Sequence, residues 1–282
     1  MKIMTRSIHN LVVVASVIFL LAAGLSQNLR AQDASQPKLT KEEIFQKSKA
    51  AYAALNSYSD EGQVVHLSDG PTVATYMGTR ITENGTRVTN FTTRLSRPNL
   101  YRITWRDNYS DPAAAPLSTA MDVWSMGDGD YLNMGFGKPA EKQKTMEDAL
   151  AGATGISSGA AAEVPAAFFN TKWANPFCCL AKGLIQQADE KVGEVDCYVF
   201  AGGTKDRTRT IWIGKQDFLI RQIRETSSAA AMKAIMDQID KDNPADDHPK
   251  IEPTGITSIE THSNIVVNKK LVEADFVPAT AK

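Results

Sequence analysis

The sequence has little cysteine, no excess of basic residues and no long apolar run. Three cysteines in 282 residues exclude a small fold built on disulfides. With 31 Lys and Arg against 32 Asp and Glu, the net charge of -1 excludes nucleic-acid binding by charge alone. The main apolar run, residues 11–23, is shorter than the ~20 residues that comfortably span a bilayer. The hydrophobic share of 43% therefore predicts an ordinary folded globular protein.

The N-terminal segment has the pattern of a secretory signal peptide. Lys2 and Arg6 precede the apolar run, and small residues follow it at Gly24, Ser26 and Ala31. A charged start, a short apolar stretch and a small-residue cleavage site are typical of export. We predict a signal peptide over 1–31, with cleavage after Ser26 or an uncleaved anchor as the alternatives. A polar linker over 32–39 and a single domain over 40–282 then follow.

Export makes a disulfide chemically possible. Cys178 and Cys179 are adjacent, and adjacent cysteines bridge each other only with strain. A bond from one of them to Cys197 is the better candidate, and closing a loop of this size stabilises by about 3 kcal/mol in the chain-entropy model. Three buried, reduced thiols are the alternative.

Alternating apolar and polar residues predict strands in two blocks. The clearest case is 99–106, where Tyr101, Ile103 and Trp105 alternate with polar residues. Short connections containing turn residues favour antiparallel neighbours. The predicted strands are 58–67, 72–82, 86–95, 99–106, 120–126, 130–135, 183–190, 195–203, 207–214, 217–225, 254–263 and 265–272.

Helices are predicted before and between these blocks. Thr40 and Glu43 form a capping box that opens a helix ending at about residue 55. Two helical insertions are predicted near 139–170 and 227–250, with helices over 139–153, 160–169 and 227–240. Strands and helices do not alternate, which disfavours a doubly wound fold. The predicted class is α+β, an antiparallel sheet of ten or so strands with helices covering its apolar face.

The sequence contains no convincing catalytic signature. Ser157 lies within 155–159, which has the letters of a nucleophile elbow but no apolar strand before it. A flexible hinge between two helices is the favoured interpretation of this glycine-rich segment. Since no set of acid, base and nucleophile converges, we predict a binding protein without catalytic residues or a cofactor.

Metal binding is also disfavoured. Glu260 and His262 share one face of a strand, as do Asp60 and His66, so they would form a site only if the two strands were neighbours. Half-exposed polar residues are the favoured interpretation. The acidic loop at 240–247 lacks the central glycine and closing glutamate of a calcium loop. We therefore predict no metal.

Several short motifs, in order and spacing, resemble the LolA-like superfamily, which includes periplasmic carriers of outer-membrane lipoproteins. The resemblance spans roughly 40–278, and the chain is longer than a typical carrier, which places it nearer an uncharacterised exported branch. It implies an open antiparallel half-barrel with helices in its concavity, a periplasmic location, and binding rather than catalysis. The motifs are Tyr58-Ser59-Asp60, Phe91-x-Thr93, Arg97-Pro98, Tyr101-x-Ile103-x-Trp105, Val192 to Val199, Thr210 to Gly214, Leu219-Ile220-Arg221, Glu260-Thr261, Asn264 and Phe276-Val277-Pro278.

An apolar sheet face covered imperfectly by helices would leave a cavity suited to an acyl chain. Methionines on the covering helices fit an adaptable lining, although plain core packing explains them equally well. The predicted lid helix carries Met232, Ile235, Met236 and Ile239. The predicted cavity lining is Phe91, Leu95, Tyr101, Ile103, Trp105, Met146, Leu150, Phe168 and Phe169.

These features predict an exported, monomeric binder or carrier of an acyl chain or other apolar ligand in the cell envelope. Its partners would be a lipid or lipoprotein and an envelope membrane protein, with no nucleic acid. Ligand transfer would proceed by opening of the helical lid. The alternative is an envelope-stress sensor or interaction module of the same fold, in which the cavity is used for sensing or filled by the protein's own side chains.

Overall fold

The computed structural model describes residues 39–70, 72–76, 79–83, 86–108, 120–135, 139–177, 183–242 and 253–278. Residues 41–282 form one compact unit, and the following account concerns that unit. The predicted signal peptide lies outside the described residues. In the part of the chain that is described, no helix is both long and apolar enough to cross a membrane.

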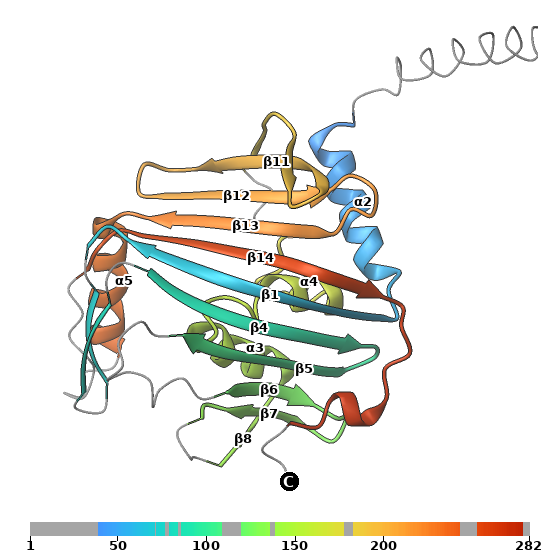
Figure 1. Cartoon of the computed structure of the whole chain (residues 1–282), viewed down its shortest axis with the longest axis horizontal. Helices are drawn as coiled ribbons and strands as arrows, with labels where there is room; N and C mark the ends of the chain where they lie inside the picture. The colour runs from blue at the N-terminus through green and yellow to red at the C-terminus, as the bar shows by residue number, and fades with distance from the viewer. Residues whose placement is uncertain are drawn as a thin grey trace, which may run out of the picture. The chain divides into compact units, whose positions relative to one another are not determined.

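Twelve antiparallel strands form one open sheet, which confirms the predicted fold class (Figure 1). The spatial order is β10-β11-β12-β13-β14-β1-β4-β5-β6-β7-β8, and β9 pairs with β11. Short sequential hairpins build both halves, as the turn residues indicated. The strands are β1 (Ser57–Ser68), β4 (Thr86–Ser96), β5 (Leu100–Asn108), β6 (Met121–Ser125), β7 (Asp130–Asn133), β8 (Glu141–Gln143), β9 (Ile185–Gln186), β10 (Glu190–Val192), β11 (Val195–Gly203), β12 (Arg207–Gly214), β13 (Ile220–Ser227) and β14 (Ile256–Val267).

The final strand joins the two halves of the sheet. β14 lies between β13 and β1, so a C-terminal segment pairs with the first strand of the domain. The sequence predicted two strands here, separated at about residue 264, but β14 runs unbroken through Asn264, whose φ is 50°. Asparagine tolerates this left-handed backbone, and the pairing with β1 shifts register there, between Ser59 and Glu61, so the strand continues through an irregularity in the ladder. This pairing creates the site described below.

Other predicted elements are divided differently, among them the strand 183–190, where the structure has β9 and β10. The expected strand 72–82 is a separate two-stranded sheet of β2 (Thr72–Tyr76) and β3 (Thr79–Glu83), because β1 pairs directly with β4 along its length. The expected helix 139–153 is β8 followed by α3 (Met146–Ile156). Thr145 fixes the start of α3, since its hydroxyl accepts a hydrogen bond from the Asp148 amide at 3.0 Å.

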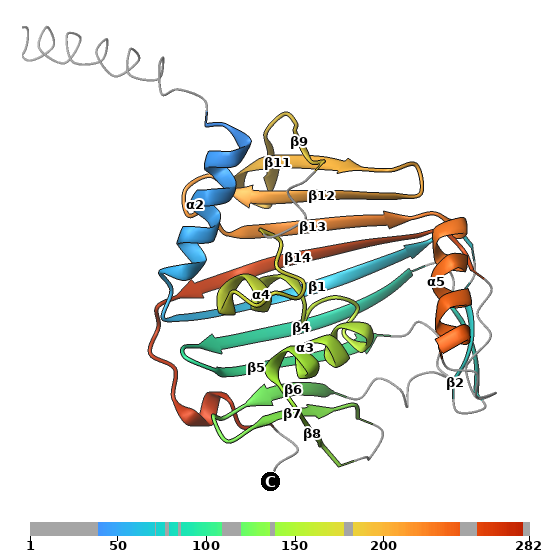
Figure 2. The ribbon, with the colours of Figure 1, turned by 180° about the vertical axis from the view of Figure 1, so that it is seen from behind.

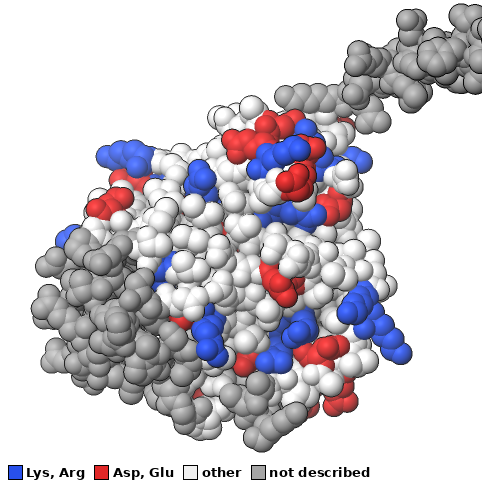
Figure 3. All heavy atoms as spheres, viewed as in Figure 1, with Lys and Arg blue, Asp and Glu red and all other residues white. Residues whose placement is uncertain are grey.

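Three helices cover one face of the sheet, which we call the inner face (Figure 2). The buried side chains of β5, Tyr101, Ile103 and Trp105, lie on this face. The helices are α2 (Lys41–Ala53), α3 and α4 (Glu163–Phe169). Helix α2 packs Phe45 against Phe200 with ring centroids 4.8 Å apart. The opposite, outer face carries Arg102, Thr104 and Arg106. Where it is described, basic and acidic side chains are intermixed across it (Figure 3).

Helix α5 (Ala229–Asp242) does not form the expected lid. It lies at the end of the sheet where β13 finishes and stands beside the β2–β3 hairpin in both views (Figures 1 and 2). Met232, Ile235 and Met236 are half-buried, and the side chain of Ile239 lies outside the description. Helical periodicity identified the helix correctly, but it could not say which surface the apolar stripe packs on.

Cys197 is a buried free thiol in the outer-face cluster with Val199 and Trp212. Its Sγ donates to the Val195 carbonyl at 3.4 Å. Burial raises the pKa of this thiol, so it is less ionised than an exposed cysteine. Cys178 and Cys179, the other candidates for the predicted disulfide, lie outside the described residues.

Gly62→Ala is expected to lower the free energy of unfolding by about 1–3 kcal/mol. A Cβ at this position would lie 2.1 Å from Phe91 Cζ and 2.5 Å from the Thr261 carbonyl oxygen. Gly155→Ala is the matched control, because nothing lies within 4 Å of its Cβ and helical glycine costs about 0.5–1 kcal/mol relative to alanine. In urea denaturation, Gly62→Ala should lower the free energy of unfolding and Gly155→Ala should raise it. Equal changes in the two variants would contradict the tight packing around Gly62.

Candidate functional site

A cavity of about 250 Å³ lies between the inner face and the turn that joins α3 to α4. Strands β1, β13 and β14 supply one wall, and the α3–α4 segment with residues 173–174 supplies the other. Ligand pockets usually measure about 300–1,000 Å³, so this cavity is slightly small for a complete ligand. Its lining residues are Val64, Thr154, Ser158, Gly159, Ala162, Glu163, Trp173, Ala174, Ile223, Glu225, Ser258 and Glu260.

The α3–α4 turn is held by polar contacts from β4. Ser158 and Gly159 both have positive φ, 60° and 106°, and a non-glycine residue in this region is strained. Arg87 Nη2 donates to Ser158 Oγ at 2.6 Å, and Thr89 Oγ1 lies 3.1 Å from the same oxygen. The predicted hinge is therefore a defined turn fastened to the sheet. Ser157 is buried, and its Oγ accepts from the Ala161 amide, which starts the turn toward α4.

Carboxylates give the cavity its charge. Glu163, on α4, has Oε1 2.7 Å from Arg209 Nη2, and Arg209 Nη1 donates to Glu225 Oε1 at 2.6 Å. Burial raises the pKa of Glu163 to about 7, with Arg209 opposing this shift and Glu260 reinforcing it. Near neutral pH this side chain therefore exchanges between its neutral and its ionised form.

A fully buried ion cluster adjoins the cavity on β1 and β14. Asp60 Oδ2 accepts from the Tyr58 hydroxyl at 2.7 Å and lies 2.6 Å from His262 Nδ1. His262 Nε2 lies 2.9 Å from Glu260 Oε1, close enough for an ion pair but not aligned as a hydrogen bond. Burial alone lowers the pKa of His262, but Asp60 and Glu260 outweigh it and raise the pKa to about 10. His262 is thus a cation between two carboxylates at neutral pH.

The sequence identified part of this cluster for a different reason. From the sequence, Asp60, Glu260 and His262 are expected to form a metal site only if their strands are neighbours. The pairing of β1 with β14 does make these strands neighbours. The geometry is that of a salt bridge rather than a chelate. Among the described residues, no group of three His, Cys, Asp or Glu side chains is arranged to hold a metal ion. His66 instead lies 2.8 Å from Ser258 Oγ, and burial, with Arg87 nearby, lowers the pKa of His66 to about 4.

The predicted lining residues lie on the inner face and on α3 and α4, but none of them lines this cavity. Leu95, Tyr101, Ile103, Leu150 and Phe168 are fully buried in the core. Phe91 and Trp105 are buried as well, whereas Met146 and Phe169 are half-buried. Their role in ligand binding therefore stays a prediction that requires α3 and α4 to move.

The sequence interpretation missed Glu163, Val64 and Trp173. An available signal was Glu163 itself, a single acidic residue inside the otherwise apolar stretch 160–169. Buried acids are rarely placed without a partner or a role. The cavity itself needed the tertiary structure, because its walls come from five separate segments of the chain.

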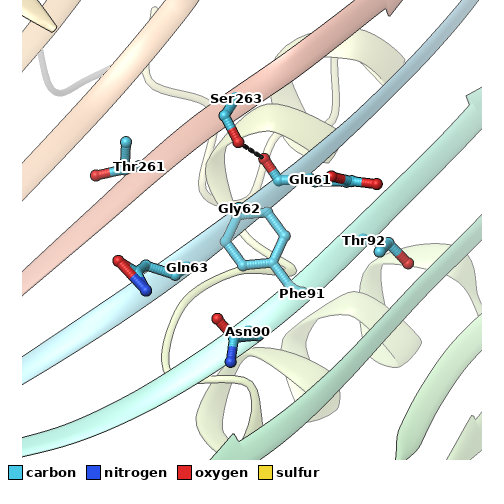
Figure 4. Close-up of a pocket in the computed structure, with 8 residues that line it drawn as sticks. All are labelled: Glu61, Gly62, Gln63, Asn90, Phe91, Thr92, Thr261 and Ser263. Carbon is cyan, nitrogen blue, oxygen red and sulfur yellow. Dashed lines mark hydrogen bonds between the residues drawn. The ribbon is translucent and has the colours of Figure 1, made fainter. Parts of the chain in front are cut away.

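The outer face has a different kind of depression, of about 410 Å³, over Gly62 (Figure 4). Gly62 has no side chain, and the ring of Phe91 lies across it on the inner side. The rim is polar and consists of Glu61, Gln63, Asn90, Thr92, Thr261 and Ser263. Apart from the Phe91 ring, this open hollow is lined by polar residues, and it is not our candidate site.

No family model and no curated protein matches the chain. Several solved structures do match it. A LolA superfamily protein from Nitrosomonas europaea is 10% identical with a TM-score of 0.33, covering 86% of this chain and 100% of its own. A DUF1329 family protein from Desulfovibrio piger is 12% identical with a TM-score of 0.31, covering 86% and 98%. The first names the superfamily that the sequence motifs resemble. Similarity this low says nothing of function, so the argument below rests on the chain's own residues.

Proposed function

We propose that the protein is an exported binding protein, not an enzyme, whose ligand carries an acyl chain or another apolar group. The ligand would enter between the inner face and the α3–α4 segment. The observation that supports this most directly is the cavity beneath the α3–α4 turn, which is walled on one side by Val64 and Ile223 and on the other by Ala162, Trp173 and Ala174.

The covering segment is suited to move as a lid. Helix α4 has seven residues and α3 has eleven, and isolated helices this short are marginal in water without packing partners. Their connection is held to β4 through the Ser158 hydroxyl, and it also buries Ala160, Ala161 and Ala162. Opening the segment would require release of both kinds of contact and would expose the apolar side chains of the inner face. Transfer of an acyl chain onto that face is favourable by ~25 cal/mol for each Å² buried.

Export and envelope location belong to the same proposal. They rest on Lys2, Arg6 and the apolar run 11–23 in the sequence. A carrier would load its ligand and release it to a partner in the envelope. The predicted lining residues Tyr101, Ile103 and Trp105 would then contact the ligand only in the opened state.

Filling the cavity tests the proposal. Ala162→Phe and Thr154→Phe each place a ring in it, whereas Ala230→Phe adds the same ring at an exposed position of α5. We expect the wild type and Ala230→Phe to bind an uncharged fluorescent probe that carries an acyl chain, and to bind it saturably. The two filled variants should bind roughly tenfold more weakly, equivalent to about 1.4 kcal/mol.

Circular dichroism should show the same fold for all four proteins. Failure of the folded wild type to bind any apolar probe would refute the proposed function. Unchanged binding in both filled variants would move the site away from the cavity.

A further inference from the structure

The chemistry of the cavity is not that of a purely apolar site. Three of its lining residues are carboxylic acids, Glu163, Glu225 and Glu260, and none of its described lining residues is a lysine, arginine or histidine. A site for a fatty acid would need the opposite arrangement, because a carboxylate head is repelled by buried carboxylates. The acidic lining therefore disfavours a ligand whose polar end is negatively charged.

Two cations already serve the acids around the cavity. Arg209 pairs with Glu163 and Glu225, and His262 lies between Glu260 and Asp60. Arg87 reaches the rim, where it donates to the Ser158 hydroxyl. Glu225 is exposed to solvent and Glu163 is partly neutral near pH 7, so the buried charge is close to balanced. A ligand cation would therefore act by adding hydrogen bonds to the buried carboxyl groups of Glu163 and Glu260.

One buried oxygen atom is also without a hydrogen-bond donor. Glu163 Oε2 is buried and lacks a hydrogen-bond partner among the described residues, whereas Glu260 Oε1 is held in an ion pair by His262 Nε2 at 2.9 Å. The other oxygen of Glu260 faces the α3–α4 turn, since a Cβ built on Gly159 would lie 3.8 Å from Glu260 Oε2. An unsatisfied buried acceptor costs about 1–3 kcal/mol, and more when charged, so such groups call for a donor.

We propose that the cavity binds the protonated primary amine of an amphiphilic ligand, with Glu163 and Glu260 accepting hydrogen bonds from the ammonium group. An ammonium has three donors and no acceptor, which matches a pocket that offers carboxylate oxygens from two sides. The apolar tail would lie along Val64, Ile223 and Trp173 and continue beneath the opened α3–α4 segment. This inference deepens the proposed function and depends on it.

Matched ligands separate the two proposals. Dodecylamine and dodecanoate have the same tail length and opposite head charges, and both are titrated below their micelle concentrations at pH 7.5 by calorimetry. We expect the amine to bind at least about tenfold more tightly, as a charge-assisted hydrogen bond predicts. Glu163→Gln and Glu260→Gln should each remove most of that preference, while the exposed Glu141→Gln on β8 should leave it unchanged.

The outcomes are distinguishable. Equal binding of the two ligands, or a preference for the amine that survives in both glutamine variants, would overturn the amine site and leave the proposed function standing. Absence of binding for both ligands would overturn the proposed function as well. The two glutamates lie on different elements, α4 and β14, so each variant tests the site if the other fails to fold.

Discussion

Between pH 7 and 9.5, the free energy of unfolding is expected to fall by on the order of 3 kcal/mol through His262 alone. The folded pKa of about 10 lies above the ordinary histidine pKa of 6.5, so above pH 6.5 the folded state holds a proton that the unfolded state has lost. The stabilisation is complete below pH 6.5 and disappears as the pH rises through 10. Urea denaturation at a series of pH values measures the slope directly.

His262→Gln is the control for this titration. The variant should be less stable at pH 7, because it leaves Asp60 and Glu260 buried without a cation, and loss of one partner of a buried pair costs about 3–5 kcal/mol. Its stability should also depend much less on pH above 7. An alkaline slope equal to that of the wild type would show that His262 is not protonated in the folded protein.

Phe168→Ala is expected to destabilise the protein by about 3–5 kcal/mol, the usual cost of removing a buried phenylalanine ring. The Phe168 ring is fully buried, lies 4.9 Å from the ring of Phe169 and lies beneath the Arg97 guanidinium at 4.7 Å. Arg97, which follows β4, also donates to the Phe168 carbonyl at 2.6 Å. Phe168 therefore fastens α4 to the end of β4. Urea denaturation reports the loss of stability.

Phe169→Ala provides the comparison for that variant. This neighbouring ring is half-buried and meets Tyr101 at 6.0 Å, so its removal should cost less than half as much. Hydrogen exchange should show α4 opening in Phe168→Ala before the sheet unfolds, as expected for a lid. Similar losses in the two variants would mean that Phe168 does not anchor α4.

The alternation of apolar and polar residues in β5 correctly predicted which of its side chains share a face. Tyr101, Ile103 and Trp105 do share the covered face, because side chains on a strand alternate whatever the strand pairs with. The same rule put Glu260 and His262 on one face. It could not pair β14 with β1, since the two strands are about 200 residues apart and their contact depends on the closure of the whole sheet.

Local sequence therefore determined the antiparallel sheet, the helices that accompany it and which strand residues share a face, because hydrophobic period and turn residues act over a few positions. Only the tertiary structure decided that α5 lies at the end of the sheet and that most of the predicted lining residues are packed into the core. It also created the cavity, since Glu163 and Glu260 come from distant segments. The burial and the charge of these two glutamates depend on contacts between distant segments, which no local sequence pattern encodes.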